Sequence, residues 1–113
     1  MTNPLDIHLE IRRLNDAFRR SLNGGGKLLM TDGITSLPCA DMAAILVKVM
    51  KYDSFPEGDD PYGEHDFGAF DHAGQRIFWK IDYYDPTEEF GSQDPADPAK
   101  TVRVLTILLA DEY

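Results

Sequence analysis

The chain has 113 residues, of which 42% are hydrophobic and 27% charged, a balance typical of one globular domain rather than of a disordered segment. No apolar run reaches the ~20 residues that a membrane span requires. The N-terminus lacks the basic and apolar regions of a secretory signal, and the single cysteine, Cys39, cannot form an internal disulfide. We therefore expect one domain over residues 1–113 in a cytoplasmic protein.

The charge is unevenly distributed. The net charge is −9, and residues 53–100 hold three Lys/Arg against thirteen Asp/Glu, whereas residues 1–52 hold seven against five. An acidic field of this kind repels nucleic acid and anionic membranes and attracts cations or basic surfaces. We therefore expect neither direct nucleic-acid binding nor membrane binding.

The first predicted element is a helix that begins at Pro4. Asn3 suits its N-cap and Pro4 its first position, and the glycine-rich segment 23–26 ends it. The side that faces the core is predicted from apolar residues at helical spacing, which are Ile7, Ile11, Leu14, Phe18 and Leu22.

A short strand over 27–31 and a turn at Asp32-Gly33 lead to a second helix, over about 38–51. This helix carries an apolar stripe of Met42, Ile45, Leu46, Val49 and Met50. An acidic loop follows over 53–65.

Three strands are predicted in the second half of the chain, over 67–71, 75–84 and 101–110, with a second long acidic loop over 85–100. Within 75–84, Ile77, Trp79, Ile81 and Tyr83 alternate with Phe78, Lys80, Asp82 and Tyr84. Strand 101–110 is apolar on both faces, which favours a central position. The predicted fold class is α+β in the order α-β-α-β-β-β, with two helices on one face of a mostly antiparallel sheet.

The segment Glu64-His65-Asp66 is the most suggestive motif for chemistry. A histidine beside carboxylates can transfer protons, and Asp59, Asp60 and Asp82 add possible oxygen ligands for a hard cation. However, consecutive residues that enter a strand point to opposite faces, so these three cannot all converge on one ion. A turn fixed by hydrogen bonds is the simpler interpretation, and we assign no catalytic residue, metal ligand or cofactor.

Two further groups of residues have ordinary structural interpretations. Lys80, Asp82, Tyr84 and Arg103 are predicted to form a polar patch on one sheet face, for which cross-strand ion pairs are a sufficient explanation. Cys39 at a helix start is expected to be a small buried residue.

Four parts of the chain form a recognisable pattern, namely Leu14-Asn15-Asp16 with Phe18-Arg19 and the segments 60–68, 79–85 and 103–110. In these parts the chain resembles a small bacterial family of unknown function, DUF3768. The resemblance implies no reaction and no catalytic residue. It implies a proteobacterial or plasmid setting, and small acidic proteins of mobile elements are often inhibitors of host defence, including anti-CRISPR and anti-restriction proteins; this last step is an analogy.

The leading hypothesis is a non-enzymatic domain that docks an acidic, aromatic-rich surface onto a basic host protein or ribonucleoprotein complex. One alternative is a small metal-dependent or acid/base enzyme with a site around Glu64-His65-Asp66, and another is a structural subunit that forms a homodimer. The residues predicted to contact the partner are Asp59, Asp60, Tyr62, Glu64, His65, Asp85, Glu88, Glu89, Asp94 and Asp97.

Overall fold

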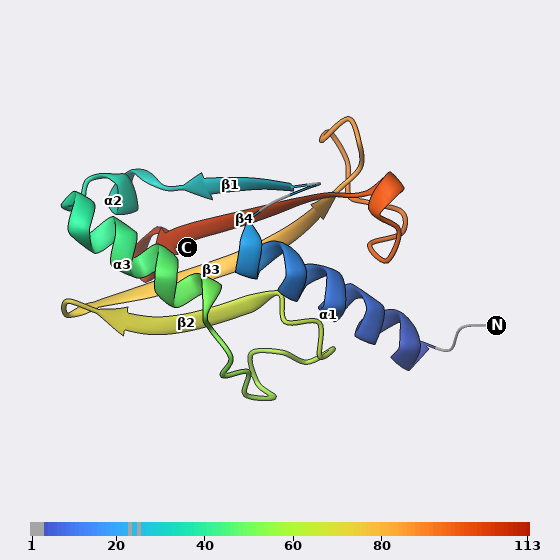
Figure 1. The fold of residues 1–113 in the computed structure, drawn as a ribbon, viewed down its shortest axis with the longest axis horizontal. Coiled ribbons are helices and arrows are strands. Elements are labelled where there is room, and N and C mark those ends of the chain that lie inside the picture. Colours follow the sequence, from blue (N-terminus) through green and yellow to red (C-terminus); the bar gives the residue numbers. More distant parts are fainter. Residues whose placement is uncertain (1–3, 23, 25) are drawn as a thin grey trace.

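The chain forms a four-stranded sheet covered by helices, as seen in a computed structural model (Figure 1). The structure describes residues 4–22, 24 and 26–113, so the predicted N-cap Asn3 and the helix-ending residues Asn23 and Gly25 lie outside the described residues. The elements in chain order are α1 Pro4–Ser21, β1 Gly26–Met30, α2 Asp32–Thr35, α3 Cys39–Met50, β2 Phe67–His72, β3 Gln75–Tyr84, the 3-10 helix η1 Pro98–Lys100, β4 Val102–Leu109 and the 3-10 helix η2 Ala110–Glu112.

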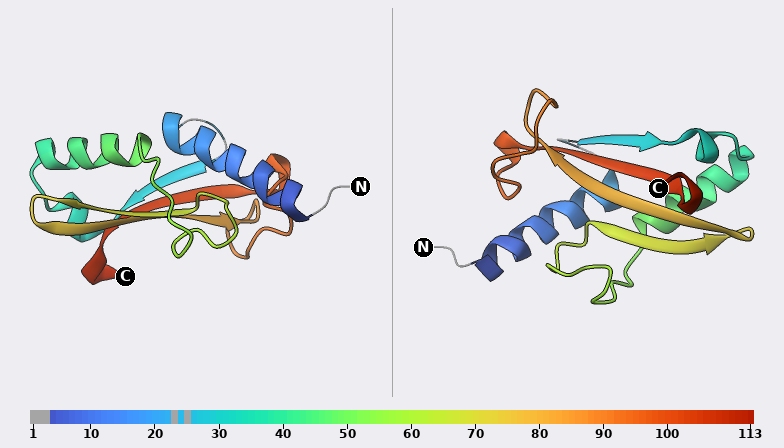
Figure 2. Two further views of the ribbon diagram at one scale, coloured as in Figure 1. Left: turned by 90° about the horizontal axis from the view of Figure 1, so that it is seen from below. Right: turned by 180° about the vertical axis from the view of Figure 1, so that it is seen from behind.

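The strand order in the sheet is β1-β4-β3-β2, with β1 parallel to β4 and the other two pairings antiparallel. Helices α1 and α3 lie over one face of this sheet, whereas η2 and the C-terminus lie on the other side (Figure 2). The predicted α+β class, the central position of β4 and the mostly antiparallel sheet are confirmed. The turn predicted at Asp32-Gly33 is instead the start of α2, a single helical turn in which Thr35 and Ser36 donate to the carbonyls of Thr31 and Asp32.

The core lies between the sheet and the helices, with Phe18 of α1, Ile34 of α2 and residues of α3 all contributing to it. Ile77, Trp79 and Ile81 of β3 are buried on the helix side, as their alternation predicts. Trp79 is paired with Ile107 of β4 on one side and with Gly68 of β2 on the other. Gly68 leaves room for the indole, because a Cβ at this position would lie 2.3 Å from Trp79 Nε1.

The predicted core-facing side of α1 is partly wrong. Ile11 and Phe18 are buried, but Ile7 is 38% exposed, whereas two polar residues, Asn15 and Arg19, have no exposed surface at all. The buried side of α1 therefore includes polar residues. Their burial is tolerated because they find hydrogen-bond partners beneath the helix.

We predict that Gly68→Ala lowers the free energy of unfolding by about 2 kcal/mol or more, because the new methyl group would overlap both the indole of Trp79 and the ring of Tyr52. Urea unfolding followed by tryptophan fluorescence measures this loss. The matched control is Gly58→Ala, where a Cβ has no heavy atom within 4 Å. Equal stability of the two variants would contradict the packing described for Trp79.

Candidate functional site

The side chain of Asn15 connects α1 to three other parts of the molecule. Its Nδ2 donates to the backbone carbonyl of Glu64, at 3.0 Å, and to the hydroxyl of Tyr83, at 2.8 Å. Its Oδ1 accepts a 2.7 Å hydrogen bond from Nε of Arg103. Asn15 is fully buried, so these contacts satisfy an amide that has no access to water.

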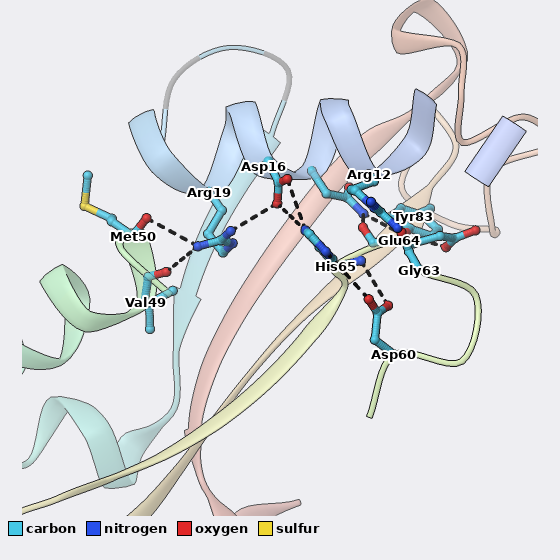
Figure 3. Close-up of polar contacts among 11 residues, drawn as sticks. Arg12, Asp16, Arg19, Val49, Met50, Asp60, Gly63, Glu64, His65 and Tyr83 are labelled. Atoms are coloured by element: carbon cyan, nitrogen blue, oxygen red, sulfur yellow. Dashed lines mark hydrogen bonds and ion pairs between the residues drawn. The ribbon is translucent and has the colours of Figure 1, made fainter. Parts of the chain in front are cut away.

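Glu64 lies inside this network rather than on the surface. One carboxylate oxygen accepts from the hydroxyl of Tyr83, at 2.9 Å, and the other lies 2.6 Å from Nδ1 of His8 on α1. Burial raises the pKa of Tyr83 well above its usual range, so this hydroxyl keeps its proton and acts as a donor to Glu64. Arg12 adds a further link from α1 by donating to the carbonyl of Gly63 (Figure 3).

His65 makes the reciprocal contact from the loop to the helix. Its Nδ1 lies 3.0 Å from a carboxylate oxygen of Asp16 on α1 (Figure 3). Its ring stacks on Phe55 with centroids 3.7 Å apart. Its backbone N–H donates to the carboxylate of Asp60. Residue 65 has a φ of +55°, so these contacts hold it in a backbone conformation that is uncommon for a histidine.

Arg19 connects α1 to the end of α3. Its Nη1 donates to the carbonyl of Val49, at 2.8 Å, and to that of Met50, and its Nη2 donates to Asp16 (Figure 3). A cation at this position complements the negative end of the α3 dipole. The guanidinium also lies over the ring of Trp79, 5.0 Å from its centroid.

The three residues Glu64-His65-Asp66 therefore do not form one site. Glu64 is directed to His8 and Tyr83, and His65 to Asp16. Within the described part of the chain, no group of three or more His, Cys, Asp or Glu side chains is placed to hold a metal ion. The segment is held by hydrogen bonds, as the simpler interpretation states, but it is an irregular stretch, and the turn lies just before it, closed by the Gly63 N–H donating to the carbonyl of Asp60.

Asp66 differs from its two neighbours because its carboxylate makes no hydrogen bond to another described residue. Burial, together with the negative charge of Glu64, raises its pKa above the ordinary value of an aspartate. The folded state therefore carries a carboxylate that is more costly to ionise than it is in the unfolded chain.

The other predicted contact residues lie on the two acidic loops, residues 53–66 and 85–101. Several are engaged in local turns. Asp85 accepts from Thr87, Asp94 from the N–H of Ala96 and Asp97 from the N–H of Ala99. Glu88 pairs with Lys27 of β1, at 2.6 Å. The carboxylates of Asp59 and Glu89 are exposed and have no partner among the described residues.

Each acidic loop also exposes one large aromatic side chain. Tyr62 is 67% exposed and Phe90 is 68% exposed. Tyr62 belongs to the residues predicted to contact a partner, whereas Phe90 is not one of those residues. The loops therefore combine carboxylates with accessible aromatic surface.

The predicted polar patch on the sheet is only partly correct. Lys80, Asp82 and Tyr84 lie on the face opposite α1 and α3, where the Lys80 ammonium is 2.7 Å from Asp82. This contact raises the pKa of Lys80. Arg103 lies on the opposite face, under α1, because it is paired with Tyr83 in the β3–β4 register. Cys39, expected to be buried, is exposed.

Sequence reasoning missed the polar residues under α1. Asn15, Arg19, Tyr83 and Arg103 did not enter the predicted site. A signal was present, since Asn15 follows Ile11 by four positions and precedes Phe18 by three, and so belongs to the same helical side as these two buried residues.

Comparison with known proteins identifies the family. The description "Protein of unknown function (DUF3768)" matches residues 30–112. The chain belongs to this family. The matched DUF3768 segment includes the acidic loops and strands β2 to β4, but it does not include α1, where part of the resemblance was placed. No curated protein and no solved structure matches, and no helix among the described residues is long and apolar enough to cross a membrane.

We predict that Asn15→Ala destabilises the protein by about 2–4 kcal/mol, because it leaves buried groups of Arg103 and Glu64 without a partner. Urea unfolding measures the loss. Arg13→Ala, which removes an exposed ion pair with Glu10 on the same helix, should leave the unfolding midpoint nearly unchanged. If both variants are equally stable, α1 does not depend on the buried network.

We predict that Asp66→Asn stabilises the protein at neutral pH. The pKa of Asp66 is higher in the folded state, so ionisation of this group lowers stability as the pH rises from the ordinary aspartate value through the folded value. The gain from the substitution should therefore be largest at about pH 7 and should shrink as the pH falls toward about 4. Thermal unfolding of both proteins across this range tests the sign, and a destabilised variant at neutral pH would contradict it.

Proposed function

We propose that this DUF3768 protein is a non-enzymatic binding domain that docks its two acidic loops onto a basic protein surface. The observation that supports the proposal most strongly is that most of the loop carboxylates have no cation beside them. Among the described residues, no Lys, Arg or His nitrogen lies within 4.0 Å of the carboxylates of Asp53, Glu57, Asp59, Asp85, Glu89, Asp94 or Asp97. Glu88 is an exception, since it pairs with Lys27.

Three of the four arginines of α1 are engaged elsewhere. Arg12 donates to the carbonyl of Gly63, Arg13 pairs with Glu10, and Arg19 pairs with Asp16 and donates to the end of α3. The negative charge of the loops therefore remains available to solvent and to a partner.

The proposed contact surface leaves out some of the residues predicted from the sequence to contact the partner. Glu64 and His65 serve the internal network, and Asp60 is held against His65, so we assign the contact to the remaining loop carboxylates together with Tyr62 and Phe90. Exposed aromatic rings beside carboxylates suit the recognition of Arg and Lys side chains. By analogy with small acidic proteins of mobile elements, we extend the proposal to inhibition of a host complex that handles nucleic acid, in which the loops would occupy the basic surface that otherwise binds phosphates.

We predict that neutralising three unpartnered loop carboxylates weakens this docking by about tenfold or more, mainly through slower association. The loop variant is Asp53→Asn with Asp59→Asn and Glu89→Gln. The matched control is Asp32→Asn with Asp71→Asn and Asp111→Asn, which changes the net charge equally at exposed positions outside the loops.

The measurement is capture from a bacterial lysate by the immobilised protein at about 50 mM and about 500 mM salt, followed by identification of the bound proteins. The proposal requires that basic nucleic-acid-handling proteins bind the wild type and the control, are lost with the loop variant and at high salt, and are displaced by added nucleic acid. Capture of the same proteins by the wild type and the loop variant would overturn it.

A further inference from the structure

A small pocket lies between α1 and the segment that leads into β4. Its volume is about 190 Å³. The residues that line it are Leu14, Ala17, Phe18, Ser21, Gly24, Pro98, Thr101 and Arg103. Most of these side chains are apolar, so the pocket is a hydrophobic recess with one cationic group in its wall.

The cationic group is a buried arginine without a counter-ion. Arg103 is only 5% exposed. No carboxylate oxygen of the described residues lies within 4.0 Å of its guanidinium nitrogens, which is the distance limit for an ion pair. Glu64 and Glu10 act on it only at longer range, and burial lowers its pKa. A guanidinium remains charged at neutral pH in spite of this shift, so a full positive charge is held close to the pocket.

Part of this guanidinium has no partner. Nε donates to Asn15 and Nη2 donates to the carbonyl of Pro95, whereas Nη1 makes no hydrogen bond to any described residue. Only Arg19 Nε and Trp79 Nε1 are enclosed without a partner among the described side chains, so Nη1 of Arg103 keeps contact with solvent. Since Arg103 lines the pocket, this is where we place that contact.

The chemistry of the pocket selects its ligand. A guanidinium with a free N–H binds a carboxylate, and the walls formed by Leu14, Phe18 and Pro98 bind a short hydrocarbon tail. The volume is below that of sites for drug-sized ligands, which limits the ligand to roughly ten non-hydrogen atoms. A phosphate dianion fits poorly, because the walls are apolar and the chain already carries a net charge of −9.

We propose that this pocket binds a small monocarboxylate with an apolar tail, and that Arg103 is its counter-ion. Pro98 and Thr101 belong to the second acidic loop, but none of the loop carboxylates lines the pocket, and the proposal does not depend on the proposed docking function. Ligand binding would supply the negative charge that Arg103 lacks, and it would stabilise the folded state in proportion to ligand occupancy.

The test is a titration of the full chain with hexanoate at about pH 7.5, where this acid is ionised. Two-dimensional ¹H–¹⁵N spectra should show saturable shifts of the Arg103 Nε–H signal and of the backbone amides of Ala17 and Thr101, and the unfolding midpoint should rise. Hexanamide has the same shape without the charge and should produce neither effect. An equal response to hexanamide, or no response to hexanoate at up to about 50 mM, would overturn the proposal.

Replacing Arg103 would also disturb the hydrogen-bond network around Asn15. A variant that fills the pocket tests the proposal without changing Arg103. Ala17→Leu adds a side chain at the pocket wall on the exposed side of α1 and should weaken hexanoate binding by at least about tenfold, with the ligand-free protein still folded. Ala43→Leu makes the same change at an exposed position of α3 outside the pocket and should leave binding unchanged. Undiminished binding by Ala17→Leu would place the ligand elsewhere and overturn the proposal.

Discussion

The orientation of α1 depends on a buried amide that must satisfy its hydrogen bonds. Asn15 can do so only where the carbonyl of Glu64, the hydroxyl of Tyr83 and the guanidinium of Arg103 converge. A hydrophobic contact tolerates small rotations and shifts, but a buried polar group that loses its partner costs the full desolvation energy. The helix is therefore fixed in one position by hydrogen-bond geometry, and the loop that carries Glu64 is fixed with it.

This arrangement also determines the distribution of charge over the surface. Four arginines lie on α1, and one more, Arg103, lies under it. Arg12 and Arg19 donate to backbone carbonyls, and Arg103 donates to Asn15 and to the carbonyl of Pro95. Arg19 also pairs with Asp16, but this carboxylate belongs to α1 itself. None of these three cations neutralises a carboxylate of the acidic loops, although Arg12 and Arg103 bond to loop carbonyls. The same residues that hold the loops in place thus leave their negative potential intact.

The predictions of strand bounds and strand positions are most accurate where a single hydrophobic pattern dominates the segment. Strand 75–84 has strict alternation, and β3 has these same bounds; strand 101–110 is apolar on both faces, and β4 is central. Prediction failed where polar residues are buried, because a hydrophobic pattern assigns Asn15 and Arg19 to solvent. Arg103 was placed on the wrong face because its own strand does not alternate, so only the register with Tyr83 reveals its side. The internal position of Glu64 depends on partners 19 and 56 residues away, which no local pattern encodes.

The hydrogen-bond network around Asn15 crosses the boundary of the family match. Glu64, Tyr83 and Arg103 lie inside the matched segment 30–112, whereas Asn15 lies outside it. Without α1, the matched segment would expose the core face around Trp79 and would leave Arg103 without the acceptor for its Nε–H. The carbonyl of Pro95, which lies within the matched segment, would then be the one acceptor left to Arg103 among the hydrogen bonds described. Asn15 on α1 therefore supplies, from outside the matched segment, an acceptor for Arg103 and a donor to Glu64 and Tyr83.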